Sequence, residues 1–121
     1  AMRAYLRAVR MQPGVDLLDC AHRFPNAAAL LLDADVEGYG GGGKRFDWSL
    51  IPTAARKTPV VLSGGLSPAN VIDGVLAVRP YAVDVSSGVE AGEKGIKDAA
   101  LIRRFCEAVR EADARLADAA N

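Results

Sequence analysis

Four short apolar runs divide the chain, and a more polar stretch follows each of them. The runs span Tyr5–Met11, Ala28–Asp33, Pro59–Ser63 and Tyr81–Val85. The last three are almost continuously apolar, which is typical of strands buried on both faces of a parallel sheet, whereas arginines interrupt the first. We therefore predict four strands, of which the first has the least regular pattern.

Two short helices are predicted ahead of the third strand. Residues Val15–Arg23 place Leu17, Leu18 and Ala21 on one side, as an amphipathic helix requires. Residues Asp47–Ala55 form a second candidate, which Pro52 limits to a turn or two.

Two further helices have clearer boundaries. Ser67 and Pro68 are suited to the N-cap and the first helical position, and Pro80 prevents that helix from continuing. From Asp98 onward, apolar residues recur every three or four positions opposite a charged face, which predicts the longest helix. We expect this helix to fray beyond about Ala112, where the sequence becomes alanine-rich.

The predicted order of elements is a strand followed by a helix, repeated four times. Such alternation indicates an α/β fold with parallel strands joined by right-handed crossovers. A complete (β/α)₈ barrel needs eight such units and roughly 200 residues or more, so a chain of 121 residues has room for a (β/α)₄ arrangement. We expect residues 1–121 to form one domain, with residues 112–121 as a frayed tail.

Composition narrows the range of partners. Lys plus Arg and Asp plus Glu number 15 each, and this balance argues against a protein that binds nucleic acid or a membrane surface. Two distant cysteines and a single histidine, His22, do not match a zinc site. No run of 18 apolar residues and no signal-peptide pattern is present, so we expect a cytoplasmic protein with reduced thiols and no membrane partner.

One carboxylate ends a buried strand. Asp33 closes the second apolar run, just before a segment that contains four consecutive glycines, Gly40–Gly43. A carboxylate in this position is costly unless it is solvated or hydrogen-bonded. It is therefore either a cap for the following loop or a general acid or base at a ligand site.

Glycine- and serine-rich loops follow the last two strands. Gly64 and Gly65 come after the third strand, and Ser86, Ser87 and Gly88 come after the fourth. Each loop alone is adequately explained as a tight turn with cap residues. Both in succession favour an anion site, because phosphate sites in barrels are frequently built from the loops after strands seven and eight.

A second carboxylate, Asp84, is predicted within the fourth strand. It either points toward the mouth of the sheet, where it would contact a substrate, or pairs with a buried cation. Glu90 is expected to cap the turn that follows.

Taken together, these segments resemble one enzyme family. The blocks LLLDA, GYGGGGKRFDW, LSGGLSPANV, AVDVSSGVE and GIKD occur in the order found in phosphoribosylanthranilate isomerases, and the resemblance extends from about Leu6 to Arg110. It implies that the four strands are strands five to eight of a (β/α)₈ TIM barrel. It also implies an Amadori rearrangement of N-(5′-phosphoribosyl)anthranilate, a phosphorylated sugar substrate of tryptophan biosynthesis, without metal or organic cofactor.

The resemblance assigns roles to individual residues. Asp33 matches the general acid that protonates the furanose ring oxygen as the ring opens. Gly65, Ser87 and Gly88 match phosphate-binding positions, and Asn70 is a candidate neighbour of that site. Asp84 matches a carboxylate near the substrate.

Two functional parts of the family pattern are missing. The general base is a cysteine in a KICG motif on strand one, which this chain lacks, and neither Cys20 nor Cys106 is expected at a strand end. The arginine that contacts the anthranilate carboxylate is also missing. The resemblance therefore implies a C-terminal half-barrel that is inactive alone, since each lost proton-transfer group costs roughly 10²–10⁴-fold. Its open sheet edges predict self-association or pairing with the missing N-terminal half.

Two other functions fit the same residues. One is a catalytically inactive, self-associating half-barrel that binds phosphate. The other is a different phosphosugar barrel enzyme, such as the related histidine-pathway isomerase or indole-glycerol-phosphate synthase. The GGGGKRFDW block argues against the second, as does the lack of a strand-end lysine.

Overall fold

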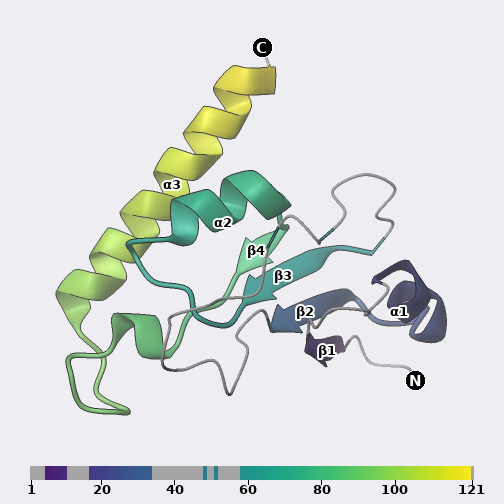
Figure 1. Ribbon diagram of the computed structural model, residues 1–121, viewed down its shortest axis with the longest axis horizontal. Coiled ribbons are helices and arrows are strands. Elements are labelled where there is room, and N and C mark those ends of the chain that lie inside the picture. The colour runs from purple at the N-terminus through teal and green to yellow at the C-terminus, as the bar shows by residue number, and fades with distance from the viewer. Residues whose placement is uncertain (1–4, 11–16, 34–47, 49–50, 52–57, 121) are drawn as a thin grey trace.

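The fold is a four-stranded parallel sheet with helices packed on it (Figure 1). The computed structural model describes residues 5–10, 17–33, 48, 51 and 58–120. Neighbouring strands follow the chain order, which confirms the predicted parallel α/β arrangement. The strands are β1 (Leu6–Arg10), β2 (Ala29–Asp33), β3 (Val60–Ser63) and β4 (Ala82–Val83).

In the described part of the chain, three α-helices and the 3₁₀ helix η2 accompany the sheet. They are α1 (Leu17–Arg23), α2 (Val71–Val78), α3 (Ala99–Ala120) and the 3₁₀ turn η2 (Ser87–Val89). Figure 1 shows α2 and α3 side by side, and η2 contacts α3 near its start. Apart from residues 48 and 51, the helix predicted for Asp47–Ala55 lies outside the described residues, as does the Gly40–Gly43 segment.

The sheet buries one face more completely than the other. Leu30 and Leu32 of β2 are buried, as are Val60 and Leu62, the residues paired with them on β3. Of the alternate residues, Ala29 is buried, whereas Leu31 and Val61 are only half-buried. The prediction of strands buried on both faces is therefore met fully on the Leu62 side, on which α2 packs, and only in part on the other side.

The two outer strands differ most from the buried pattern. In β1, only Val9 is even half-buried. The guanidinium of Arg7 lies 4.2 Å from the ring centroid of Phe24, so a cation–π contact holds this strand to the segment after α1. The strand β4 pairs with β3 only through Ala82 and Val83, so it is shorter than predicted.

The start of α2 is later than predicted. Ser67 begins a hydrogen-bonded turn, because the N–H groups of Asn70 and Val71 both donate to its carbonyl oxygen, and the helix itself begins at Val71. The Ser67 N–H donates to Asn70 Oδ1 at 2.8 Å, which is one half of a capping box. Arg79 ends the helix in a left-handed conformation (φ 51°), just before Pro80 as expected.

The start of α3 agrees with the sequence pattern, whereas its end does not. Asp98 Oδ1 accepts hydrogen bonds from the N–H groups of Ala100 and Leu101, so it caps the helix. The structure continues α3 as regular helix to Ala120, beyond the point where fraying is predicted. Alanine favours helix, and Ala112 is fully buried, with Leu116 packed against the core one turn later.

Candidate functional site

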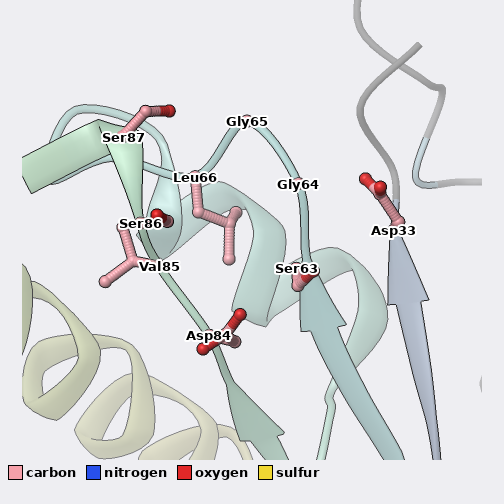
Figure 2. A pocket seen from close by; sticks show the side chains of 9 residues that line it. All are labelled: Asp33, Ser63, Gly64, Gly65, Leu66, Asp84, Val85, Ser86 and Ser87. Carbon is pink, nitrogen blue, oxygen red and sulfur yellow. The ribbon is translucent and has the colours of Figure 1, made fainter. Parts of the chain in front are cut away.

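A polar cavity lies at the carboxyl ends of β2, β3 and β4 (Figure 2). Its volume is about 220 Å³, smaller than the roughly 300–1,000 Å³ typical of pockets for drug-sized ligands. A cavity of this size suits one polar group of a larger ligand. Its described lining consists of Asp33, Ser63, Gly64, Gly65, Leu66, Asp84, Val85, Ser86 and Ser87.

Strand register explains why three polar side chains meet here. Asp33 of β2 is paired with Ser63 of β3. On the other side of β3, Leu62 is paired with Val83, so Asp84 follows one position later, level with Ser63. Alternate side chains of a strand face the same side, so Asp33, Ser63 and Asp84 share one face and one edge of the sheet. The N–H of Asp84 donates to the Leu62 carbonyl oxygen at 2.9 Å and so continues the ladder.

The loop after β3 forms one wall of the cavity. Gly64 and Gly65 have φ values of 86° and 68°, a left-handed conformation that glycine adopts without strain. The side chain of Asn70 holds this loop in place. Its Nδ2 donates to the Gly65 carbonyl oxygen at 2.9 Å, and its Oδ1 accepts from the Ser67 N–H. The loop is thus fixed by a side chain that lies outside the cavity.

The loop after β4 forms the facing wall and fits tightly against the first. Gly88, in η2, lies so close to the first loop that an added Cβ would overlap the carbonyl oxygen of Leu66. Only glycine permits this approach of two backbones. The contact joins the two loops and explains why a glycine follows Ser86 and Ser87.

The structure brings together most of the residues that the sequence predicted for the site. Six of them line the cavity, whereas Asn70 and Gly88 lie behind its walls. Asp84 directly follows β4 and is not within it as predicted: residue pairing with β3 ends at Val83, although the Asp84 N–H still bonds the Leu62 carbonyl oxygen. Sequence reasoning missed Ser63, although its position at the end of an apolar run and directly before the two glycines could have indicated it; its pairing with Asp33 comes from the structure. The six are Asp33, Gly64, Gly65, Asp84, Ser86 and Ser87.

An ion pair lies behind the second loop. Glu90 Oε2 accepts a hydrogen bond from the N–H of Gly95 at 2.8 Å and another from Lys97 Nζ at 3.1 Å. These bonds, the Gly95 bond first, hold the pKa of Glu90 below its ordinary value of 4.5. Glu90 therefore ties the loop between η2 and α3 together, in agreement with its predicted role as a cap.

This arrangement makes stability depend on pH below about 4.5. Because the pKa of Glu90 is lower in the folded chain than in the unfolded chain, the ionised group stabilises the fold above pH 4.5, and this contribution is lost as the pH falls through the folded pKa. We expect Glu90→Gln to lower the melting temperature near neutral pH. The difference from wild type should shrink as the pH approaches 3, and a constant difference between pH 3 and pH 7 would contradict the assignment.

The remaining candidate residues lie away from the cavity. Cys20 and Cys106 are free thiols on α1 and α3, and His22 is exposed on α1. Within the described ranges, no group of three or more His, Cys, Asp or Glu side chains is placed to hold a metal ion. None of the helices in the described part of the chain is long and apolar enough to cross a membrane.

The fold and the cavity define a class of protein. Parallel β/α proteins, whether barrels or open sheets, bind ligands at the carboxyl ends of their strands, as the cavity here is placed. The family model for N-(5′-phosphoribosyl)anthranilate isomerase matches residues 4–108. The chain belongs to this family.

Similar curated proteins agree with this family assignment. The chain is 70% identical over 119 residues to the N-(5′-phosphoribosyl)anthranilate isomerase of Leptothrix cholodnii, covering 98% of this chain and 53% of the relative. It is 72% identical over 115 residues to that of Methylibium petroleiphilum, covering 95% and 53%. The chain thus spans about half the length of the curated relatives it matches.

Solved structures show the same fold. The phosphoribosyl anthranilate isomerase of Thermotoga maritima superposes with a TM-score of 0.73 at 41% identity, over 89% of this chain and 52% of that one. A second isomerase structure, in complex with reduced 1-(o-carboxyphenylamino)-1-deoxyribulose 5-phosphate, gives 0.70 at 38% identity, over 89% and 49%. These neighbours are TIM-barrel enzymes, so the four strands form part of a (β/α)₈-type fold.

Proposed function

We propose that this chain supplies the phosphate-binding loops and the general acid of a phosphoribosylanthranilate isomerase. In this role it acts on N-(5′-phosphoribosyl)anthranilate, in the cytoplasmic synthesis of tryptophan. The observation that carries the proposal is the cavity itself, which brings Asp33 together with the loops after β3 and β4. The related structure that holds a ribulose 5-phosphate derivative supports the substrate class.

The two loops suit an anion better than the carboxylate side of the cavity does. Two carboxylates, Asp33 and Asp84, line the cavity and would repel a phosphate group. Hydroxyl groups of Ser86 and Ser87 and the backbone of the two-glycine turn line the remainder and offer donors to its oxygens. We therefore place the phosphate against the loops and the sugar ring toward Asp33.

Catalysis needs a proton donor and a proton acceptor, and in the proposed assignment the chain supplies the family's donor, Asp33, but not its cysteine base. Asp33 is half-buried at the end of β2, within reach of a ligand in the cavity. The family's base is a cysteine, and both cysteines of this chain lie on helices away from the cavity lining. We propose that the chain by itself binds phosphate without turning over the substrate.

Thermal melting with inorganic phosphate tests the binding site. At a phosphate concentration ten times the dissociation constant, we expect a rise of roughly 4–8 °C in melting temperature. Ser87→Ala should reduce this rise because it removes a donor, whereas Asp33→Asn should not reduce it. A melting temperature that is independent of phosphate, with chloride at equal ionic strength as the control, would contradict the site.

A fluorescence assay for loss of phosphoribosylanthranilate, run on the same samples, tests the catalytic part of the proposal. We expect no turnover. Turnover that Asp33→Asn abolishes would mean that another residue supplies the base, and would overturn the proposed inactivity while supporting Asp33 as the acid.

We also propose that the sheet edges pair with another chain, either a second copy or a polypeptide that supplies the other half of the barrel. Leu6 of β1 is 57% exposed, and Tyr81, directly before β4, is 80% exposed. Outer strands with unpaired backbone groups favour such pairing. We expect a concentration-dependent dimer in size-exclusion chromatography with light scattering, and Leu6→Lys should weaken it. A monomer throughout the micromolar range would contradict self-association.

A further inference from the structure

The ammonium group of Lys97 reaches the cavity wall from behind. Lys97 precedes α3, and its Nζ donates to the carbonyl oxygen of Ser86 at 2.9 Å and to Ser86 Oγ at 3.3 Å. A third bond goes to Glu90 Oε2 at 3.1 Å. Ser86 lines the cavity, whereas Lys97 is not part of its lining. The lysine therefore contacts the site only through Ser86.

These three contacts use all the donors that the side chain has. A lysine ammonium carries three N–H donors and no acceptor. Lys97 can thus bond a ligand directly only by giving up one of its contacts. Its charge is also matched by that of Glu90, so it adds little net positive potential to the cavity.

The contact with Ser86 Oγ restricts the direction of the Ser86 hydroxyl hydrogen. Because Lys97 can only donate, Ser86 Oγ is the acceptor of that bond, and its own hydrogen must point elsewhere. The Ser86 carbonyl oxygen is already occupied by Lys97 and by the N–H of Val89 at 3.4 Å. The hydroxyl hydrogen is therefore available to an acceptor in the cavity that Ser86 lines.

Backbone pairing holds Lys97 in this position. Glu90 and Lys97 form an antiparallel bridge, and the N–H of Asp98 donates to the Val89 carbonyl oxygen at 2.7 Å. The N–H of Ala91 donates to the Ile96 carbonyl oxygen at 2.8 Å. The lysine stem is thus held by a closed loop that ends where Asp98 caps α3.

We propose that Lys97 is a positioning residue, which makes the Ser86 hydroxyl a committed hydrogen-bond donor to an acceptor-only ligand such as a phosphate dianion. The inference rests on the proposed phosphate site and adds a residue that neither lines the cavity nor touches the ligand. It predicts that the effect of Lys97 on binding passes through Ser86 Oγ and not through the Ser86 carbonyl oxygen, which Lys97 also bonds. A lysine that only strengthens the loop would affect binding whether or not Ser86 carries its hydroxyl.

A double-mutant cycle in calorimetric titrations of the chain with inorganic phosphate tests this. Ser86→Ala and Lys97→Met should each weaken binding about tenfold, the value of one charge-assisted hydrogen bond. The double variant should bind no more weakly than Ser86→Ala alone. Lys97→Arg, which keeps a donor, should restore binding to within about threefold of wild type. Lys94→Met is the matched control, because it removes the same charge from the same loop and should leave affinity unchanged.

The outcomes separate the inference from the function on which it rests. Multiplied losses in the double variant, or an unchanged affinity in Lys97→Met, would overturn the role of Lys97 while the phosphate site stands. An equal loss of phosphate affinity in Lys94→Met would show that the effect comes from charge alone, and this would also overturn the role of Lys97. If wild type binds no phosphate, the proposed site is wrong and the inference with it. If Lys97→Met fails to fold, Lys97→Arg is compared with and without Ser86→Ala: any loss that Lys97→Arg causes beside Ser86 should be absent when position 86 is alanine, and a loss that persists there would overturn the role of Lys97.

Discussion

Gly88→Ala is expected to destabilise the chain by about 1–3 kcal/mol and to weaken phosphate binding more than tenfold. The added Cβ would overlap the carbonyl oxygen of Leu66, and Ser67 Cα lies close as well. Both neighbours are backbone atoms, so no side chain can rotate away. One of the two loops must move, and both line the cavity. Urea unfolding and phosphate titration would measure the two effects.

Gly92→Ala provides the matched control. Gly92 has φ 93°, and an added Cβ at this position meets no atom within 4 Å. The substitution therefore introduces only backbone strain, about 1–2 kcal/mol, and should leave phosphate affinity unchanged. If Gly88→Ala kept wild-type affinity, or behaved like Gly92→Ala in both measurements, the two loops would not be locked by this contact.

Leu62→Ala is expected to cost about 2–5 kcal/mol of the free energy of unfolding. Leu62 is fully buried in β3, and its side chain packs against Gly74 of α2, where the ring of Trp48 also lies. Shortening it leaves a cavity between the sheet and α2 that this helix cannot readily fill. Stabilities of single domains are commonly only about 5–15 kcal/mol, so the variant should have a much lower urea midpoint.

Truncating a more exposed aliphatic side chain to alanine is the control for Leu62→Ala. Ile102 of α3 is 43% exposed, so Ile102→Ala should change the free energy of unfolding by under about 1 kcal/mol. Equal losses in Leu62→Ala and Ile102→Ala would show that β3 is not the centre of the core. Because Leu62 directly precedes Ser63, phosphate binding to the folded fraction of Leu62→Ala should also be weaker.

Much of the fold can be predicted from local patterns. The apolar runs locate β2 and β3 to within a residue, and Asp98 marks the start of α3, because burial, alternation and capping depend on neighbouring residues. The loops that line the cavity are also predictable, since parallel strands place their carboxyl ends at one edge. The positive φ values of Gly64 and Gly65 follow from residue type.

Other features depend on contacts between distant segments. The length of β4 is set by how far β3 pairs with it, and the last turns of α3 are stabilised by burial of Ala112 and Leu116, so local composition predicts neither. Strand register brings Asp33 into step with Ser63.

The cavity wall also depends on contacts between distant segments. The need for glycine at position 88 comes from the Leu66 carbonyl oxygen, more than 20 residues earlier in the chain, and the role of Lys97 comes from its reach back to Ser86. The sequence by itself determines which residues gather at the carboxyl edge of the sheet. Only the folded chain decides which of them face the cavity and which hold its walls, because packing and register act between segments that the sequence keeps apart.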